Sequence, residues 1–91
     1  MPVTLTGHID VPLDRLDEVE TALQDHIRLT RAEPGCLSFE VTPHATIAGR
    51  LEVQEAFVNQ EAFDAHQART LASPWAETTR GIDRNYMVSI E

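Results

Sequence analysis

The order of two kinds of periodic segment most constrains how this chain can fold. Apolar and polar residues alternate with period two in four segments, which predicts strands at residues 3–10, 36–41, 51–57 and 86–90. Between the first two, apolar residues recur at three- and four-residue steps from Leu13 to Ile27, which predicts an amphipathic helix that begins near Pro12. Glu33-Pro34-Gly35 ends this helix, because proline disfavours helical geometry in the residue before it.

Two further helices are predicted between the third and fourth strands. Asn59 can cap a short helix that runs to Ala68. Ser73-Pro74 is a second start signal, for a turn or two up to Arg80. The order strand, helix, strand, strand, helix, strand predicts an α+β, ferredoxin-like βαββαβ fold with a four-stranded antiparallel sheet and helices on one face. With 91 residues, we expect one domain over residues 1–91.

The two faces of the predicted sheet are both poor in charge. One face is almost entirely apolar, and the other carries mainly small or uncharged side chains: Thr4, Thr6, His8, Cys36, Ser38, Gln54, Ala56, Met87 and Ser89. A solvated face would carry more charge, and the helices suffice for one face only. We therefore predict a homodimer that packs sheet to sheet.

Composition excludes several classes of function. The net charge is −8 and the seven basic residues are scattered arginines, so neither nucleic acid nor a membrane surface is an expected partner. The chain has no lysine for Schiff-base chemistry and no glycine-rich phosphate loop. Cys36 is the only cysteine, and we see neither a secretory signal nor an apolar span, so a cytoplasmic location is expected.

Two motifs give the chain a family resemblance. Glu33-Pro34-Gly35-Cys36-Leu37-Ser38-Phe39-Glu40 opens a predicted strand, and Glu55-Ala56-Phe57 leads into Ala62-Phe63-Asp64-Ala65-His66. These segments resemble the antibiotic biosynthesis monooxygenase family, in the right order and over essentially the whole chain. The resemblance implies a dimeric α+β barrel. It also implies oxygenation of quinols or polycyclic phenols by O2, without metal or flavin.

Two histidines are candidates for the base that would deprotonate such a substrate. His66 matches the helix histidine of the family and could face the cleft between helices and sheet, or it could merely bond carbonyl groups at its helix end. His8 lies mid-strand on the semi-polar face, where it could line a pocket or a dimer interface.

Five further residues are candidates for substrate binding. Glu55 shares a face with apolar residues, so it is a tuned acid or base or, as the commoner case, paired with an arginine such as Arg84 or Arg80. A third possibility is that Glu55 lies near the strand end and reaches water. Trp75 and Phe63 could wall a pocket or simply fill the core. Tyr86 could bond a quinol oxygen or sit at the rim, and Arg69 could neutralise a phenolate or have no such role.

Metal binding is not expected, because the four histidines show no metal-ligand spacing. Haem degradation, known in a branch of the superfamily, is disfavoured because Thr78, Thr79 or Arg80 stands where that branch has its iron ligand. We therefore predict a cofactor-independent monooxygenase that oxidises a small aromatic quinol or phenol with O2 as co-substrate. The alternative is a non-catalytic dimeric α+β barrel that binds a small hydrophobic ligand.

Overall fold

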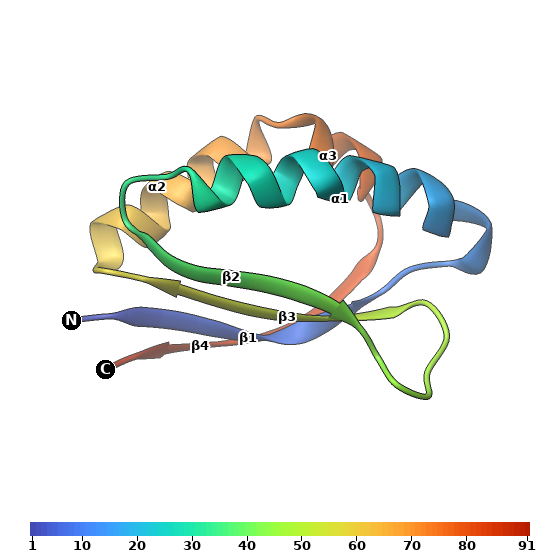
Figure 1. Cartoon of the computed structure of the whole chain (residues 1–91), viewed down its shortest axis with the longest axis horizontal. Helices are drawn as coiled ribbons and strands as arrows, with labels where there is room; N and C mark the ends of the chain where they lie inside the picture. Colours follow the sequence, from blue (N-terminus) through green and yellow to red (C-terminus); the bar gives the residue numbers. More distant parts are fainter.

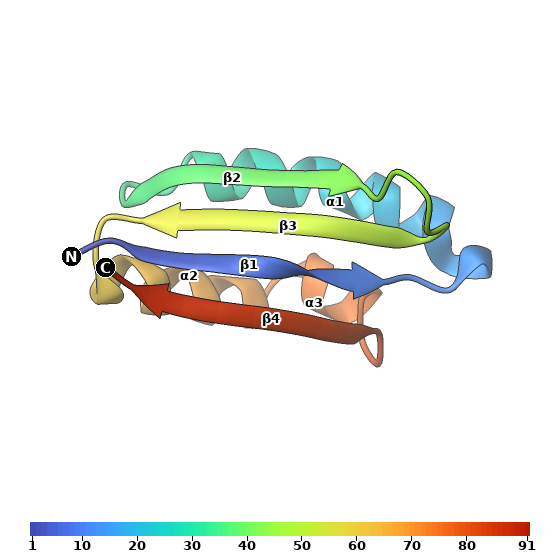
Figure 2. The same ribbon diagram turned by 90° about the horizontal axis from the view of Figure 1, so that it is seen from below.

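A computed structural model describes all 91 residues of the chain. Its elements follow the predicted order: β1 (Val3–Asp10), the 3-10 turn η1 (Leu13–Arg15), α1 (Leu16–Arg31), β2 (Cys36–Pro43), β3 (Arg50–Phe57), α2 (Gln60–Leu71), α3 (Pro74–Thr78) and β4 (Asp83–Ile90). The four strands form one antiparallel sheet in the order β2-β3-β1-β4 (Figure 2). All three α-helices lie on one face of it (Figure 1). The predicted ferredoxin-like α+β fold is confirmed.

Helix boundaries differ from the prediction at three places, one of which is the end of α3, at Thr78 rather than Arg80. The turn after Pro12 is a 3-10 turn in which Leu13 is 66% exposed, so this leucine is not part of the buried helical stripe. Asn59 caps α2 as predicted, accepting a hydrogen bond from the Ala62 N–H at 2.9 Å. The helix, however, continues to Leu71 rather than ending at Ala68. None of the helices is long and apolar enough to cross a membrane.

The core between helices and sheet consists of two apolar clusters. One joins α1 and α3 to the sheet and is centred on Ile9, Val19 and Trp75. The other joins α2 to the sheet through Phe57 and Phe63, whose ring centroids lie 5.8 Å apart in an edge-to-face arrangement. These clusters hold the three helices against the sheet, and the titratable residues described below lie in the same layer.

Strand β4 is less covered than the pattern predicts. Tyr86, Val88 and Ile90 oppose Gly7, Leu5 and Val3 of β1, which places them on the helix side of the sheet. Their exposed fractions are nevertheless 38%, 49% and 62%. The apolar alternation therefore gives the correct face for β4, but the helices of this chain do not bury it.

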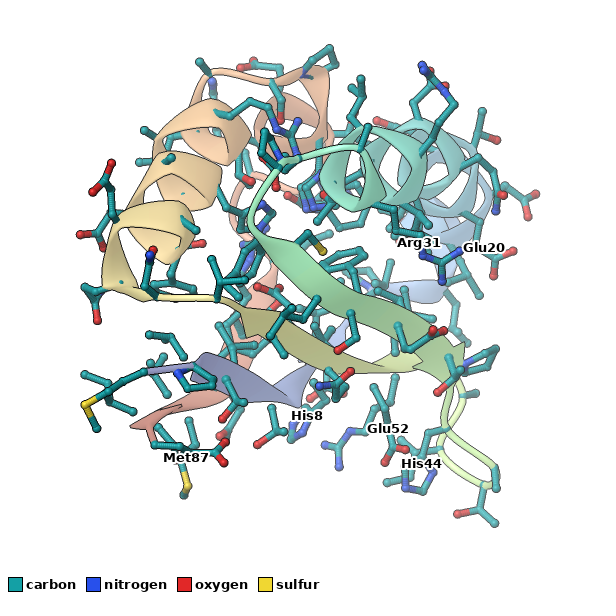
Figure 3. The ribbon with its side chains drawn as sticks, turned by 60° about the vertical axis from the view of Figure 1, so that its left-hand side comes forward. His8, Glu20, Arg31, His44, Glu52 and Met87 are labelled. Atoms are coloured by element: carbon teal, nitrogen blue, oxygen red, sulfur yellow. The ribbon has the colours of Figure 1, made fainter.

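The opposite face of the sheet carries the side chains that the sequence assigns to a semi-polar face. Figure 3 shows His8, Glu52 and Met87 projecting from the sheet away from the helices. Charged residues gather at one end of this face, where the Arg50 guanidinium donates to the Asp10 carboxylate at 2.7 Å. Met87, which is paired with Thr6 near the middle of β1, is 70% exposed on this face.

Candidate active site

A cavity of about 370 Å³ lies between the helices and the sheet. Its size falls in the range of small-molecule sites. Nine of its fifteen lining residues are hydrophobic. The lining comprises Leu5, Ile9, His26, Phe39, Val41, Val53, Glu55, His66, Gln67, Thr70, Leu71, Trp75, Ala76, Arg84 and Tyr86. The cavity thus combines apolar walls with a small set of titratable groups.

The loop between α1 and β2 packs directly against α2. A Cβ atom added at Gly35 would lie 2.3 Å from the Cβ of Ala62, so only glycine permits this approach. The Gly35 carbonyl also accepts a hydrogen bond from the Val58 N–H at 2.9 Å. This contact brings Glu33, two residues before Gly35, against the inner side of α2.

Glu33 orients His66. The Nδ1 atom of His66 lies 2.8 Å from Glu33 Oε1, and the Arg69 guanidinium donates to Glu33 Oε2 at 2.6 Å. Because a carboxylate held by arginine is an acceptor, Nδ1 carries the proton, and Nε2 presents its lone pair. Burial lowers the pKa of His66, although the hydrogen bond to Glu33 opposes this, so the neutral imidazole is favoured. His66 is therefore an oriented, uncharged base that is only 2% exposed.

Glu55 lies beside the Nε2 atom of this base, which the Thr70 hydroxyl also approaches to 3.5 Å. Its Oε1 atom is 3.6 Å from His66 Nε2 and has no hydrogen-bond partner in the protein. Burial, and secondarily the charge of Glu33, raises the pKa of Glu55 to about 7. Glu55 is therefore a second group in the cavity that can take up or release a proton near neutral pH.

The prediction that Glu55 pairs with an arginine such as Arg84 or Arg80 is wrong. Arg80 pairs with Glu77 in the neighbouring turn, and the Arg84 guanidinium donates to the hydroxyl and carbonyl groups of Thr79. Both arginines are thus occupied near their own positions in the chain. Of the other two interpretations of Glu55, a carboxyl group with a tuned pKa is the one that agrees with its surroundings.

Aromatic rings form one wall of the cavity. Trp75 stacks on His26 with ring centroids 4.8 Å apart and 5° between the planes. Trp75 also belongs to a buried cluster, so the two readings of this residue, cavity wall and core, both hold. Tyr86 lines the cavity from the less covered strand β4.

The remaining predicted site residues lie outside the cavity lining. Phe63 packs on Phe57 in the core, and Arg69 contacts Glu33 rather than the cavity. His8 is on the opposite face of the sheet, 3.7 Å from Asp10, where it cannot reach a molecule bound beside His66. A role for His8 would require a separate site on that face.

Sequence reasoning missed Glu33 and His26 as site residues. In the sequence, Glu33 stands out only as part of a helix stop and a family motif, and His26 lies on the long helix near its polar boundary. His26 is nevertheless 5% exposed, and it continues the buried stripe Val19, Leu23, His26 and Thr30. The helical spacing of these four residues was the signal that could have found it.

This geometry suits proton removal from an aromatic substrate. Apolar walls accept a flat ring, His66 and Glu55 accept a proton, and Glu33 with Arg69 fixes the base. No group of three or more His, Cys, Asp or Glu side chains in the structure could hold a metal ion.

Comparisons with known proteins agree with this architecture. A family model described as antibiotic biosynthesis monooxygenase matches residues 2–77, whereas no curated protein matches the chain. Among solved structures, an antibiotic biosynthesis monooxygenase superposes with a TM-score of 0.86 at 16% identity, covering 98% of this chain and 97% of that one. SnoaB from Streptomyces nogalater, described as a cofactor-independent oxygenase, gives 0.82 at 14% identity, covering 99% and 92%. Rv0793 from Mycobacterium tuberculosis gives 0.74 at 23% identity, covering 100% and 97%.

Proposed function

Because this chain belongs to the antibiotic biosynthesis monooxygenase family, we propose that it oxidises a small aromatic quinol or phenol with O2 and without a cofactor. The observation that carries the proposal is a pair of buried proton acceptors, His66 and Glu55, in an aromatic-lined cavity. The description of SnoaB as a cofactor-independent oxygenase supports the absence of a cofactor.

The first step is removal of the phenolic proton by His66 Nε2. The resulting imidazolium lies between the Glu33 carboxylate at 2.8 Å and the Glu55 carboxyl group at 3.6 Å, which stabilises its positive charge. The apolar walls do not stabilise a phenolate, but a phenolate formed beside them has few hydrogen-bond donors around it and gives up an electron to O2 more readily. The chain therefore supplies a base, an orienting carboxylate and a largely apolar cavity.

The remaining steps balance without an external reductant. The phenolate transfers an electron to O2, and the two radicals combine to form a C–O bond at a ring carbon that bears hydrogen. Loss of that hydrogen as a proton, with cleavage of the O–O bond, leaves a ring carbonyl and releases water. A phenol thereby becomes a quinone, and a quinol becomes a hydroxyquinone. His66 returns its proton to the departing oxygen.

Oxygen uptake with a panel of reduced naphthoquinones, corrected for autoxidation, tests the proposal. We expect turnover that falls at least about 100-fold in His66→Ala, the usual effect of removing a general base. His44→Ala is the matched control, since His44 lies in the β2–β3 loop, where its Nδ1 accepts hydrogen bonds from the N–H groups of Thr46 and Ile47. No enzymatic uptake would refute the proposal, and ligand binding without uptake would support the binding-protein alternative.

We also propose that two copies of the chain pack sheet to sheet. The uncharged part of the outer face, which includes Thr4, Ala56 and the exposed Met87, supports this assembly. The charged pair Asp10–Arg50 lies at the other end of the face. A cytoplasmic location is likewise a proposal, which rests on the single cysteine of the sequence.

A further inference from the structure

His26 is a buried titratable side chain that the mechanism above does not use. It lines the same cavity as His66, and its Nδ1 atom is enclosed without a hydrogen-bond partner. The other nitrogen, Nε2, has no hydrogen-bond partner in the protein either. The open space beside His26 is the cavity that it lines. Buried polar groups are nearly always paired, so an imidazole without partners at a cavity wall points to a ligand.

The ring of His26 is held in a fixed orientation. It is stacked on Trp75 and meets the edge of Phe39, with centroids 5.4 Å apart and 85° between the planes. Burial, together with the nearby His66, Arg69 and Arg84, lowers the pKa of His26 to about 3. The ring is therefore neutral at physiological pH and offers one donor and one acceptor. A proton on the enclosed Nδ1 would be an unmet donor, so the proton belongs on Nε2.

His26 and His66 then present a hydrogen-bond donor and a hydrogen-bond acceptor, respectively, to the same cavity. Their ring centroids lie 6.0 Å apart. His66 presents a lone pair at Nε2, because Glu33 fixes its proton at Nδ1. His26 presents an N–H group. One substrate hydroxyl can give its proton to His66 while a second substrate oxygen accepts a hydrogen bond from His26.

We propose that His26 is a substrate-binding residue that donates from Nε2 to a second substrate oxygen, so that the cavity selects aromatic rings with two neighbouring oxygen functions. Neighbouring here means ortho positions of one ring, or peri positions across two fused rings. If the two oxygens lay at opposite ends of a ring, each with a hydrogen bond of about 2.8 Å, the two imidazole centroids would have to be further apart than 6.0 Å. The inference rests on the proposed use of this cavity for an aromatic substrate, but it does not require turnover.

Anaerobic calorimetric titration tests the selectivity separately from catalysis. The probes are 1,8-dihydroxynaphthalene, with peri oxygens, 1,5-dihydroxynaphthalene, with oxygens far apart, and 1-naphthol, with a single oxygen. We expect the peri isomer to bind about 3- to 10-fold more tightly than the other two, the effect of one net hydrogen bond. His26→Phe keeps the stacking ring and should abolish this preference, so that the three probes bind to this variant within about 2-fold of one another. His26→Gln keeps a neutral donor and should retain part of the preference.

Nitrogen NMR of the histidine rings gives a readout that does not depend on the variants. We expect His26 protonated at Nε2, with a change in that signal when the peri isomer binds. A proton at Nδ1, equal affinities for the three probes, or an unchanged preference in His26→Phe would overturn the inference. Selective binding without oxygen uptake would leave it standing and refute the proposed function, whereas oxygen uptake without selectivity would do the reverse.

Discussion

Replacing Glu55 with glutamine should change how the stability of the fold depends on pH. The Glu55 carboxyl has an ordinary pKa of 4.5 and a pKa of about 7 in the folded chain, mainly because of burial. Above pH 4.5 the unfolded chain loses this proton while the folded chain keeps it, so stability falls as pH rises towards 7. At about 1.4 kcal/mol per pH unit, the full loss is roughly 3 kcal/mol. Glutamine is neutral at every pH, so the Glu55→Gln variant does not show this loss of stability.

Urea unfolding at one fixed protein concentration, at intervals from pH 4 to pH 8.5, measures the effect. We expect the difference in unfolding free energy between Glu55→Gln and the parent to move in favour of the variant by roughly 3 kcal/mol between pH 4 and pH 8.5. Any packing change adds a constant offset and does not affect this difference. Glu52→Gln is the matched control, on the same strand but on the exposed face. A flat difference for Glu55→Gln, or an equal one for Glu52→Gln, would show that Glu55 is not held protonated by burial.

Two further predictions use other parts of the structure. The pKa of His26 lies at about 3 rather than 6.5, so the unfolded chain takes up a proton first and stability falls as pH drops below 6.5. His26→Phe should therefore lose less stability than the parent between pH 6.5 and 4.5, by up to roughly 3 kcal/mol in urea titrations, and an equal loss would contradict the burial argument. Sedimentation should give twice the chain mass for the parent and the single mass for Met87→Asp on the outer face, with Leu13→Asp, equally exposed on η1, as control. A parent that sediments as a single chain would refute the sheet-to-sheet dimer.

The sequence predicts the fold because local periodicity determines most of it. Four alternating segments and the long helical stripe place the strands and α1 within a few residues of their observed positions. Leu13 is the clear error in the stripe, because its spacing fits the helix although Pro12 begins a 3-10 turn there. The exposure of Val88 and Ile90 cannot be predicted from the sequence either. Alternation gives the face of a strand but not whether a helix covers it.

The site is less predictable because its partners are distant in sequence. His66 follows from the family resemblance, but its partner Glu33 lies 33 positions earlier and is brought close only by the packing of Gly35 on Ala62. Glu55 stands out as a charge among apolar neighbours, which the sequence shows. The sequence does not show whether an arginine pairs with Glu55, because Arg80 and Arg84 each have a nearer acceptor that only the folded structure reveals.

The charges around the cavity constrain the form in which a phenol can enter. Glu33 is already neutralised by Arg69, whose guanidinium also donates to Thr30 Oγ1 at 2.9 Å. Arg69 is thus engaged with Glu33 and lies outside the cavity lining, so its two open alternatives, neutralising a phenolate or having no such role, stay predictions. With Glu55 partly ionised near pH 7, a second anion brought in from solvent would meet an existing negative charge in a poorly solvated space. A neutral phenol that loses its proton to His66 inside the cavity avoids this repulsion, because the imidazolium and the phenolate form together. On the proposed function, a base inside the cavity is therefore needed even for substrates that are acidic in water.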